Sequence, residues 1–482
     1  MSGTFRSLSV RNYRLWFFGA FISNVGAWMQ STTQNWVVLT ELTDNNASAV
    51  GITMALQFGP QLLLVPFSGA VADRFDRRKV LLITQTLLML LAAGLGTLLI
   101  AGHAELWHLY AFALGLGLVN AFDATSRQAF VSNLVGNDDL SNAVALNSAS
   151  FNSARLIGPA VAGVLIAAIG SGWVFIINAA SFVAMLGALL LINTIYERNE
   201  SGRRESQLRQ LSAGVRYVSG RRDLLVIFVM VFLVGAFSMN FPVMSSTMAV
   251  EFGRGAEDYG LLSSILAVGS LAGALLAARR QQARMRVVII AVGGLGVVSI
   301  IGAIMPTFWT FAATLVFFGL ATSTMLTTAN GFVQTTSSPA VRGRVLALYM
   351  AILMGGTPIG APLVGAAADA LGARSTFVIS GIAALVAFAI GFTWLLVARQ
   401  LRLRWRSGLR VTHIGRPNLD DDPAKQVEAL TAPLDVLGRT GSEETVTRIA
   451  DSAPQEGGAG TGIIELDPDA FGDDREPPKS TA

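Results

Sequence analysis

Cysteine is absent from the chain, which excludes disulfides, thiolate metal sites and cysteine nucleophiles. Histidine is scarce, and the wide spacing of His103, His108 and His413 does not predict a metal site. Charged residues make up only 14% of the 482 residues, whereas a soluble domain carries roughly 25%. A surface that faces water needs that charge, but a surface that faces lipid does not. With 52% hydrophobic residues and a mean hydropathy of +0.55, the composition predicts an integral membrane protein.

Motifs for nucleotide binding and hydrolysis are missing as well. The sequence contains no P-loop, no Gly-x-Ser-x-Gly nucleophile elbow and no zinc-binding motif. We therefore expect no enzyme activity, no cofactor and no metal site. Transport driven by ATP is also disfavoured for this chain alone.

Long apolar runs divide the sequence into two sets. Runs of ~20 residues are long enough to cross the hydrocarbon core of a bilayer as helices. They lie at 15–39, 49–72, 80–102, 106–126, 143–168 and 173–195, and then at 224–248, 259–278, 287–305, 308–330, 344–368 and 376–398. The runs predict an all-α integral membrane protein with about twelve transmembrane helices in two six-helix halves.

The same pattern sets the expected domain boundaries. The N-terminal half covers residues 1–195, a polar cytoplasmic linker covers 196–223, and the C-terminal half covers 224–399. A cytoplasmic tail follows at 400–482. Its few aromatic residues and its many Asp, Glu, Gly and Pro residues predict that it is largely disordered.

Basic residues alternate with the predicted spans. Lysine and arginine concentrate in short cytoplasmic loops of membrane proteins. Here they cluster at 6–14, 74–79, 198–222, 279–286 and 342–344, whereas the loops on the other side hold only Arg254 and Arg374. We therefore predict a multi-pass protein of the cytoplasmic membrane with both termini in the cytoplasm. The net charge of +4 is then a topology signal and does not indicate nucleic-acid binding.

An internal repeat relates the two halves. When the run at 143–168 is moved 202 positions along the chain, Gly158 meets Gly360 and Gly163 meets Gly365. Repeated halves are common in secondary transporters, whose substrate site lies between them near the middle of the membrane.

A basic motif follows the second span. It comprises Gly69, Asp73, Arg74, Arg77 and Arg78. Glycine allows close helix approach, and the arginines can hold anionic lipid headgroups of the bilayer. The alternative is a loop of ordinary charges.

This motif resembles the signature of the major facilitator superfamily, Gly-x-x-x-Asp-(Arg/Lys)-x-Gly-(Arg/Lys)-(Arg/Lys), with Asp76 in place of its second glycine. The resemblance covers roughly residues 10–400. It implies that Asp73 and Arg77 belong to a latch between the two halves that gates the change of state. The segments ADRFDRRKV, FDATSRQAFV, NAVALNSASFNSARLIGPAVAG and RGRVLALYM are similar to the branch of siderophore exporters, such as enterobactin exporters, and of macrolide and multidrug efflux carriers.

Small residues mark the fifth span. Ala154, Gly158, Pro159 and Gly163 resemble the Gly-Pro motif of proton-coupled drug exporters in this superfamily. Small faces let helices touch, and proline removes one helical hydrogen bond. The resemblance implies a packing hinge between the halves, and the alternative is plain helix packing.

Polar residues within the spans are candidates for a cavity that holds substrate or ions, because such residues avoid lipid. Arg155 lies mid-span, and Trp28 could stack on an aromatic substrate. The set is Asn24, Trp28, Gln30, Ser31, Gln34, Arg155 and Asn240. The alternative for the stripe along the first span is hydrogen bonding between helices, and the alternative for Arg155 is a structural role satisfied by helix carbonyls or by Asn152.

Asp123 is the most deeply embedded carboxylate, and Arg127 follows it by one helical turn. It is a candidate proton carrier, whereas Glu41 and Asp369 lie near the outer surface. The alternative is a pair that only anchors the loop. Many proton-coupled relatives carry an arginine where this chain has Ala111, so Arg155 or Arg127 would have to replace it.

These features favour a monomeric secondary transporter that exports amphipathic small molecules, similar to siderophores, drugs or metabolites, by alternating access and proton antiport. An uptake symporter for a small nutrient is the first alternative. A membrane sensor or scaffold that binds a partner through its tail is the second.

Overall fold

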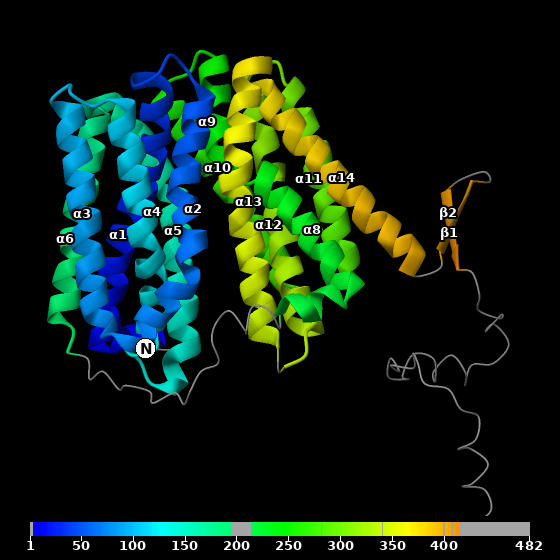
Figure 1. Cartoon of the computed structure of the whole chain (residues 1–482), viewed down its shortest axis with the longest axis horizontal. Coiled ribbons are helices and arrows are strands. Elements are labelled where there is room, and N and C mark those ends of the chain that lie inside the picture. Colours follow the sequence, from blue (N-terminus) through cyan, green and yellow to red (C-terminus); the bar gives the residue numbers. More distant parts are fainter. Residues whose placement is uncertain are drawn as a thin grey trace, which may run out of the picture. The chain divides into compact units, whose positions relative to one another are not determined.

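The computed structural model describes residues 3–193, 214–280, 282–339, 341–398, 401–405 and 409–413. It confirms the all-α membrane fold (Figure 1). The helices are η1 (Gly3–Ser9), α1 (Arg11–Trp36), η2 (Val37–Glu41), α2 (Ala47–Arg74), α3 (Arg77–Ile100), α4 (Leu106–Val131), α5 (Asn137–Ile169), α6 (Ser171–Leu191), α8 (Arg222–Phe237), α9 (Phe241–Glu251), α10 (Ala256–Ala278), α11 (Met285–Ile304), α12 (Phe308–Thr336), α13 (Arg342–Leu371) and α14 (Arg374–Ala398).

Within these residues, 11 helical segments are long and apolar enough to cross a membrane. Helix α1 is long enough at 26 residues, but its polar residues lower its hydropathy. Successive spans are antiparallel. We call the end at which α2, α4, α10 and α12 finish the basic end, where the chain also starts (Figure 1). The other end is called the opposite end.

The turn at the basic end of α2 does not need the glycine that the superfamily prefers there. Asp76 has φ −60° and ψ 113°, an extended conformation that any residue adopts. Its carboxylate accepts a hydrogen bond from the backbone N–H of Arg78 at 2.9 Å. Asp76 is therefore the N-cap of α3, a role that aspartate fills well.

The run predicted at 224–248 lies within one candidate membrane span, Arg222–Glu251, but this seventh span contains a break that the sequence did not predict. Helix α8 ends at Phe237 and α9 starts at Phe241, with Pro242 in its first turn. Proline has no N–H to donate to the preceding turn. The side-chain amide of Asn240 instead donates to the carbonyl of Ala236.

The repeated glycines occupy matching places in the two halves. Gly170 directly follows α5, with φ 88° and ψ 158°, and Gly372 directly follows α13, with φ 87° and ψ 161°. These positive φ values favour glycine. Gly158 contacts Trp28 of α1, while Gly360 contacts Ala236 of α8.

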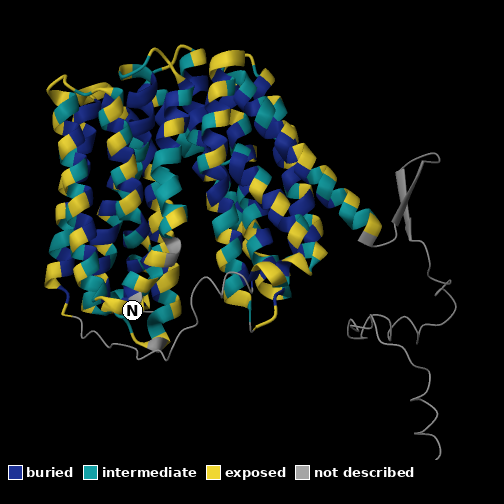
Figure 2. Cartoon of the chain, in the orientation of Figure 1, coloured by how far each residue is buried: buried dark blue, intermediate teal, exposed yellow. Residues whose placement is uncertain are grey.

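The hydrophobic core is divided in a way that separates the two ends. One cluster combines buried residues of the C-terminal half with residues from the opposite-end part of the N-terminal half, such as Trp36 and Val50. A second cluster lies near the basic end, and all its members come from the N-terminal half, among them Tyr13, Trp16 and Phe130. Large apolar residues such as Leu63 are exposed, and exposed positions recur along the helices of both halves (Figure 2), as expected for lipid contact.

The tail starts with structure that the sequence did not predict. Strands β1 (Leu401–Trp405) and β2 (Leu409–His413) pair antiparallel, with Leu403 opposite Val411. The rest of the predicted tail and the first part of the linker, 194–213, lie outside the described residues. Residues 214–219 are helical, and the hydroxyl of Tyr217 accepts a hydrogen bond from the backbone of Ser338.

Replacing Gly360 by Ala tests the close packing of α13 on α8. A Cβ at this position would overlap the carbonyl oxygen of Ala236, a backbone atom that cannot rotate away. We expect a loss of about 1–3 kcal/mol or more in stability, because overpacking forces a backbone shift. Thermal unfolding of the purified protein in detergent measures it.

Gly294→Ala is the matched control, because a Cβ at Gly294 of α11 meets nothing within 4 Å. It should leave the melting temperature unchanged or raise it slightly. Equal melting temperatures for the two variants would contradict the close contact.

Candidate functional site

A carboxylate of the C-terminal half caps a helix of the N-terminal half at the opposite end. Asp369, near the end of α13, accepts hydrogen bonds from the backbone N–H groups of Ala47 at 2.7 Å and Ser48 at 2.9 Å. The hydroxyl of Ser48 also donates to it. These N–H groups start α2, whose first turn holds no acidic residue. Asp369 thus supplies the negative charge that a helix N-terminus favours.

Small residues bring the two halves into contact beside this cap. Gly51 of α2 lies against the backbone of Ala361, and Gly365 lies against the backbone of Ala47. A hollow of about 580 Å³, lined by Asp44, Glu251, Asp369 and neighbouring residues, opens next to the contact. The cap is therefore reached by solvent and can be broken at modest cost.

Helices α5 and α10 form the second contact between the halves. A Cβ at Gly163 would lie 2.7 Å from the carbonyl oxygen of Ala256. Gly260 packs on the carbonyl of Pro159, and the hydroxyl of Ser264 donates to the carbonyl of Leu156 at 2.9 Å.

An aromatic pair adds to this contact. The rings of Trp36 and Tyr259 are stacked, with centroids 5.7 Å apart. Tyr259 is only 1% exposed. Trp36 is the last residue of α1 in the N-terminal half, and Tyr259 lies in the first turn of α10 in the C-terminal half. The stack therefore joins the two halves at the opposite end.

The predicted hinge residues of α5 therefore fall on two different faces. Pro159 and Gly163 contact the other half, whereas Gly158 packs on Trp28 of its own half, where a Cβ would lie 2.5 Å from that of Trp28. Ala154 is fully buried. The structure places part of this set between the halves and part within one half.

The predicted gating motif holds the N-terminal half together at the basic end. The guanidinium of Arg77 donates to the carbonyl of Ala129 at 3.1 Å and to the side chain of Asn133 at 2.7 Å, both near the end of α4. Arg78 donates to the carbonyl of Leu190 at 2.9 Å. These bonds satisfy carbonyls at helix ends.

For two other members of the gating motif, the structure gives burial but no contact with the other half among the described residues. Gly69 is half-buried in α2, and Arg74 is exposed at its end. The side chain of Asp73 lies outside the described residues. A latch that joins Asp73 and Arg77 to the other half thus stays a prediction.

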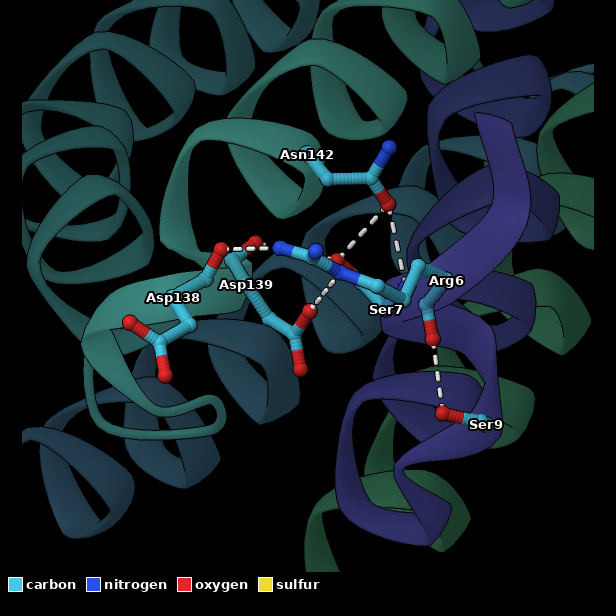
Figure 3. A network of polar contacts seen from close by, with 6 residues as sticks. All are labelled: Arg6, Ser7, Ser9, Asp138, Asp139 and Asn142. Carbon is cyan, nitrogen blue, oxygen red and sulfur yellow. Dashed lines mark hydrogen bonds and ion pairs between the residues drawn. The ribbon is translucent and has the colours of Figure 1, made fainter. Parts of the chain in front are cut away.

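The chain start is fastened to α5 at the same end (Figure 3). Arg6 bonds to the carboxylate of Asp139 and to the carbonyl of Asp138. The backbone N–H and the hydroxyl of Ser7 both donate to the side-chain oxygen of Asn142, at 3.0 and 2.8 Å. Arg6, one of the charges that indicate topology, therefore also has a structural partner.

The polar stripe of α1 is shared among several neighbours. Gln30 is 4% exposed and bonds to Asn178 of α6, while Gln34 is 1% exposed and donates to Gln57 of α2 at 3.1 Å. Asn24, Trp28 and Ser31 are half-buried. The structure does not bring the whole stripe together at one surface.

Arg155 lies with two aromatic residues. Its guanidinium carbon is 5.7 Å from the ring centroid of Trp28, within the range of a cation–π contact. The ring of Trp28 packs edge-on against Phe151, with centroids 5.7 Å apart. Asn152, the alternative partner for Arg155, donates instead to the carbonyl of Ser148.

Asn240, predicted to join the cavity, is fully buried at the break in the seventh span. Its side-chain oxygen has no hydrogen-bond partner among the described residues. Its bond to Ala236 accounts for the backbone at the break. In the described part of the chain, Asn240 makes no contact with Arg155.

Asp123 is the centre of a buried polar network. Arg127 donates to one carboxylate oxygen at 2.6 Å, and Thr84 and Gln85 of α3 each donate to the other at 2.7 Å. Arg127 reaches Ser23 of α1 at 3.4 Å. The network links three helices of the N-terminal half.

The outer acidic and basic residues have local roles. Glu41 accepts a hydrogen bond from Ser171 at the start of α6. Arg374 donates to the carbonyls of Ala303 and Met305 at 2.8 Å each and so caps α11. Among the described residues, no group of three or more His, Cys, Asp or Glu side chains could hold a metal ion.

Sequence reasoning missed the role of Asp369, which it treated as a weak proton carrier. The signal for the cap is faint: α2 starts without an acidic residue in its first turn, whereas α10 starts with Glu257 and Asp258. The sequence also gave no sign that Trp36 and Tyr259 meet.

Comparison with known proteins identifies relatives along most of the chain. The sequence profile of a family described as Transmembrane secretion effector matches residues 2–403. The Staphyloferrin A transporter of Staphylococcus aureus is 25% identical over 396 residues, which cover 81% of this chain and 97% of that protein. The Enterobactin exporter EntS of Shigella boydii serotype 18 is 25% identical over 396 residues, which cover 81% of this chain and 92% of that protein.

Solved structures share the fold. A bacterial homologue of the human lysosomal transporter Spinster, in an inward-facing and unoccupied conformation, gives a TM-score of 0.64 at 13% identity and covers 82% of this chain and 99% of that chain. The nucleoside transporter NupG gives a TM-score of 0.61 at 14% identity and covers 80% of this chain and 99% of that chain. At this identity the likeness concerns the fold alone.

Replacing Asp369 by Asn tests the cap at the opposite end. The amide keeps the shape but removes the charge that α2 attracts, so the contact should weaken by about 1 kcal/mol, roughly fivefold in the ratio of closed to open states. Because the chain has no native cysteine, spin labels on Asp44→Cys and Ala370→Cys report the distance across this end. We expect a larger population at long distances.

Asp258→Asn is the control, because Asp258 pairs with Arg254 of its own half at 3.5 Å. It should leave the distance distribution unchanged. An unchanged distribution in the Asp369 variant would mean that the cap does not hold the halves together.

Proposed function

We propose that this chain, which belongs to the Transmembrane secretion effector family of major facilitator transporters, exports amphipathic small molecules from the cytoplasm by alternating access. That it is a multi-pass membrane transporter follows from the family. Its relatives are transporters and not enzymes, in agreement with the motifs that the sequence lacks. The export direction, the coupling to protons and the kind of substrate are our proposals.

The divided hydrophobic core carries the proposal of alternating access. Near the opposite end, one cluster includes residues from both halves. Near the basic end, the N-terminal half has a cluster of its own. A chain packed in this way can part at one end without exposing the core of either half, which is what rocking of two halves about a central site requires.

The orientation follows from charge. Arginines concentrate at the basic end, and basic loops stay in the cytoplasm. With this orientation, the contacts between the halves at the opposite end correspond to a state closed toward the outside. Such a state is the one that loads an exporter.

The substrate class is supported by the relatives. Two of them are described as a transporter of staphyloferrin A and an exporter of enterobactin, so we propose cargo similar to siderophores, drugs or other amphipathic metabolites. We propose a monomer, because both halves that enclose the path belong to one chain. A nutrient symporter is the weaker candidate, since one of the two sequence relatives is described as an exporter.

We propose protons as the coupling ion. Asp123 is the one buried carboxylate among the described residues, and with Arg127 it is the proposed proton carrier. Its partners must exchange during the cycle for this role. If they do not, the pair is structural and another group couples transport.

Cysteine labelling tests the orientation. His103→Cys lies in the exposed loop between α3 and α4, and Ser338→Cys lies in the exposed turn between α12 and α13. A membrane-impermeant maleimide should label the first in intact cells and the second only in inverted vesicles. Labelling of both from one side would contradict the alternating topology.

Inverted vesicles test export and coupling together. Respiration acidifies their lumen, and an exporter that exchanges protons should release part of that acidity when substrate is added outside. Siderophores, macrolides and dyes are the compounds to add, with a pH-sensitive fluorophore as the readout. Cells that express the chain should also grow at several-fold higher concentrations of the same compounds, whereas an uptake symporter would make them more sensitive.

Asp123→Asn separates a carrier from a structural pair. If Asp123 carries the proton, the variant should lose proton release yet still exchange labelled for unlabelled substrate across the membrane. Gln61→Ala is the control, because Gln61 bonds only weakly, at 3.4 Å, to a carbonyl of its own helix. Loss of both activities together with a lower melting temperature would assign the pair a structural role.

A further inference from the structure

We propose that Arg155, Trp28 and Phe151 bind the carboxylate and the ring of an aromatic organic anion. The inference rests on the proposed transport function, because it names the class of cargo that the carrier would select. It is carried by the placement of Arg155, by its lack of an anionic partner, and by the two rings beside it.

Arg155 points toward the middle of the molecule. In a helix, residues three and four positions away lie on the same side. Gly158, three positions on, packs on α1, and Pro159, four positions on, packs on α10. The Arg155 side chain therefore lies between the two rows that contact the neighbouring helices. The other side of α5 carries Ile157, an exposed apolar residue that suits lipid.

The charge of Arg155 is unpaired within the described residues. No ion pair and no hydrogen bond of its guanidinium occurs there, although the side chain is half-buried in the middle of a span. A charged group at such depth is costly unless it faces a partner or water. Arg127 and Arg374, by contrast, each bind an oxygen of the protein.

The chemistry of the guanidinium defines one part of the ligand. Its planar set of donors matches a carboxylate in a two-pronged arrangement. A cationic ligand would be repelled by the guanidinium, and a neutral ligand would not compensate its charge. The neighbouring Asn152 and Ser148 are exposed on α5 and offer further polar groups, since the amide oxygen of Asn152 is not used in its bond to Ser148.

The two rings define the other part. Trp28 lies under the guanidinium, and Phe151, 47% exposed, meets Trp28 edge-on. Aromatic rings prefer such edge-on or offset arrangements, which a third ring can extend. An aromatic carboxylate therefore satisfies charge and rings at once.

The site also adjoins the contact between the halves. Leu156, the next residue along α5, accepts the hydrogen bond of Ser264 from the other half. A ligand held at Arg155 would lie where the closed part of the interface begins. Binding there is well placed to influence whether the halves stay together.

Binding of 2-naphthoate to the purified full-length chain in detergent tests the proposal. Titration calorimetry is compared with 2-naphthylmethylammonium, which has the same ring and the opposite charge, and with cyclohexanecarboxylate, which lacks the aromatic ring. We expect both analogues to bind about tenfold more weakly or worse. Arg155→Gln should weaken naphthoate binding by about tenfold or more, and Trp28→Ala by about threefold to tenfold.

Two variants keep the result interpretable. Arg155→Lys keeps the charge and should retain part of the affinity, and Ile157→Ala, on the lipid side of the same helix, should bind naphthoate like the original chain. Melting temperatures show that each variant is folded. Equal affinity of folded Arg155→Gln and the original chain, or preference for the cation, would overturn the proposal.

The outcome can be told apart from failure of the transport proposal. If vesicles export compounds of the siderophore, macrolide and dye panel while naphthoate binding ignores Arg155, the ligand class is wrong and export stands. If naphthoate binds through Arg155 but no compound moves in vesicles or in cells, the site is correct and the export proposal fails.

Discussion

Close backbone contact between helices of opposite halves is the constraint on which the rest of the structure depends. In lipid, apolar helices gain nothing by leaving the hydrocarbon, so they associate through dispersion and hydrogen bonds at short range. That range is reached here where side chains are minimal, at Gly51 and Gly365 for one pair of helices and at Gly163 and Gly260 for the other. Because these positions lie toward one end of the spans, the halves are joined there and keep separate cores toward the basic end.

The two contacts between the halves are built alike but are not equivalent. In each, a repeated glycine packs on the first turn of a helix from the other half, Gly163 on α10 and Gly365 on α2. Helix α10 brings its own acidic residues to that turn, whereas α2 has none and receives Asp369 from α13. The favourable charge at α10 therefore survives when the halves part, but the charge at α2 is lost. Opening this end costs more at the α2 contact, which makes that contact the natural point of control.

The sequence predicted what depends on local composition. Apolar length located the spans, and matched glycines predicted the repeat, because both properties are carried by each segment alone. The break before Pro242 was missed because Ser238 and Asn240 are only two polar residues within a long apolar run. The role of Asp369 could not be predicted, since its partners are more than 300 positions away in the chain. The partners of the polar stripe of α1 could not be predicted for a related reason: a sequence shows that Gln30 avoids lipid but not that Asn178 of α6 donates a hydrogen bond to it.

Asp123 and Arg155 of the N-terminal half differ in their partners, and this difference distinguishes a structural charge from one that is available to a ligand. Asp123 has a donor on each carboxylate oxygen, and all of its partners belong to its own half. It moves with that half as a unit, so a change of state alone does not alter its surroundings. Arg155 has no such partners within the part of the chain that the structure describes, and it lies next to the contact with the other half. A proton carrier at Asp123 would thus need its network to loosen, and the longest bond in it, the 3.4 Å contact of Arg127 with Ser23 of α1, is the place where that can begin. Trp28, which lies beside Arg155, and Ser23, which Arg127 contacts, belong to the same helix α1.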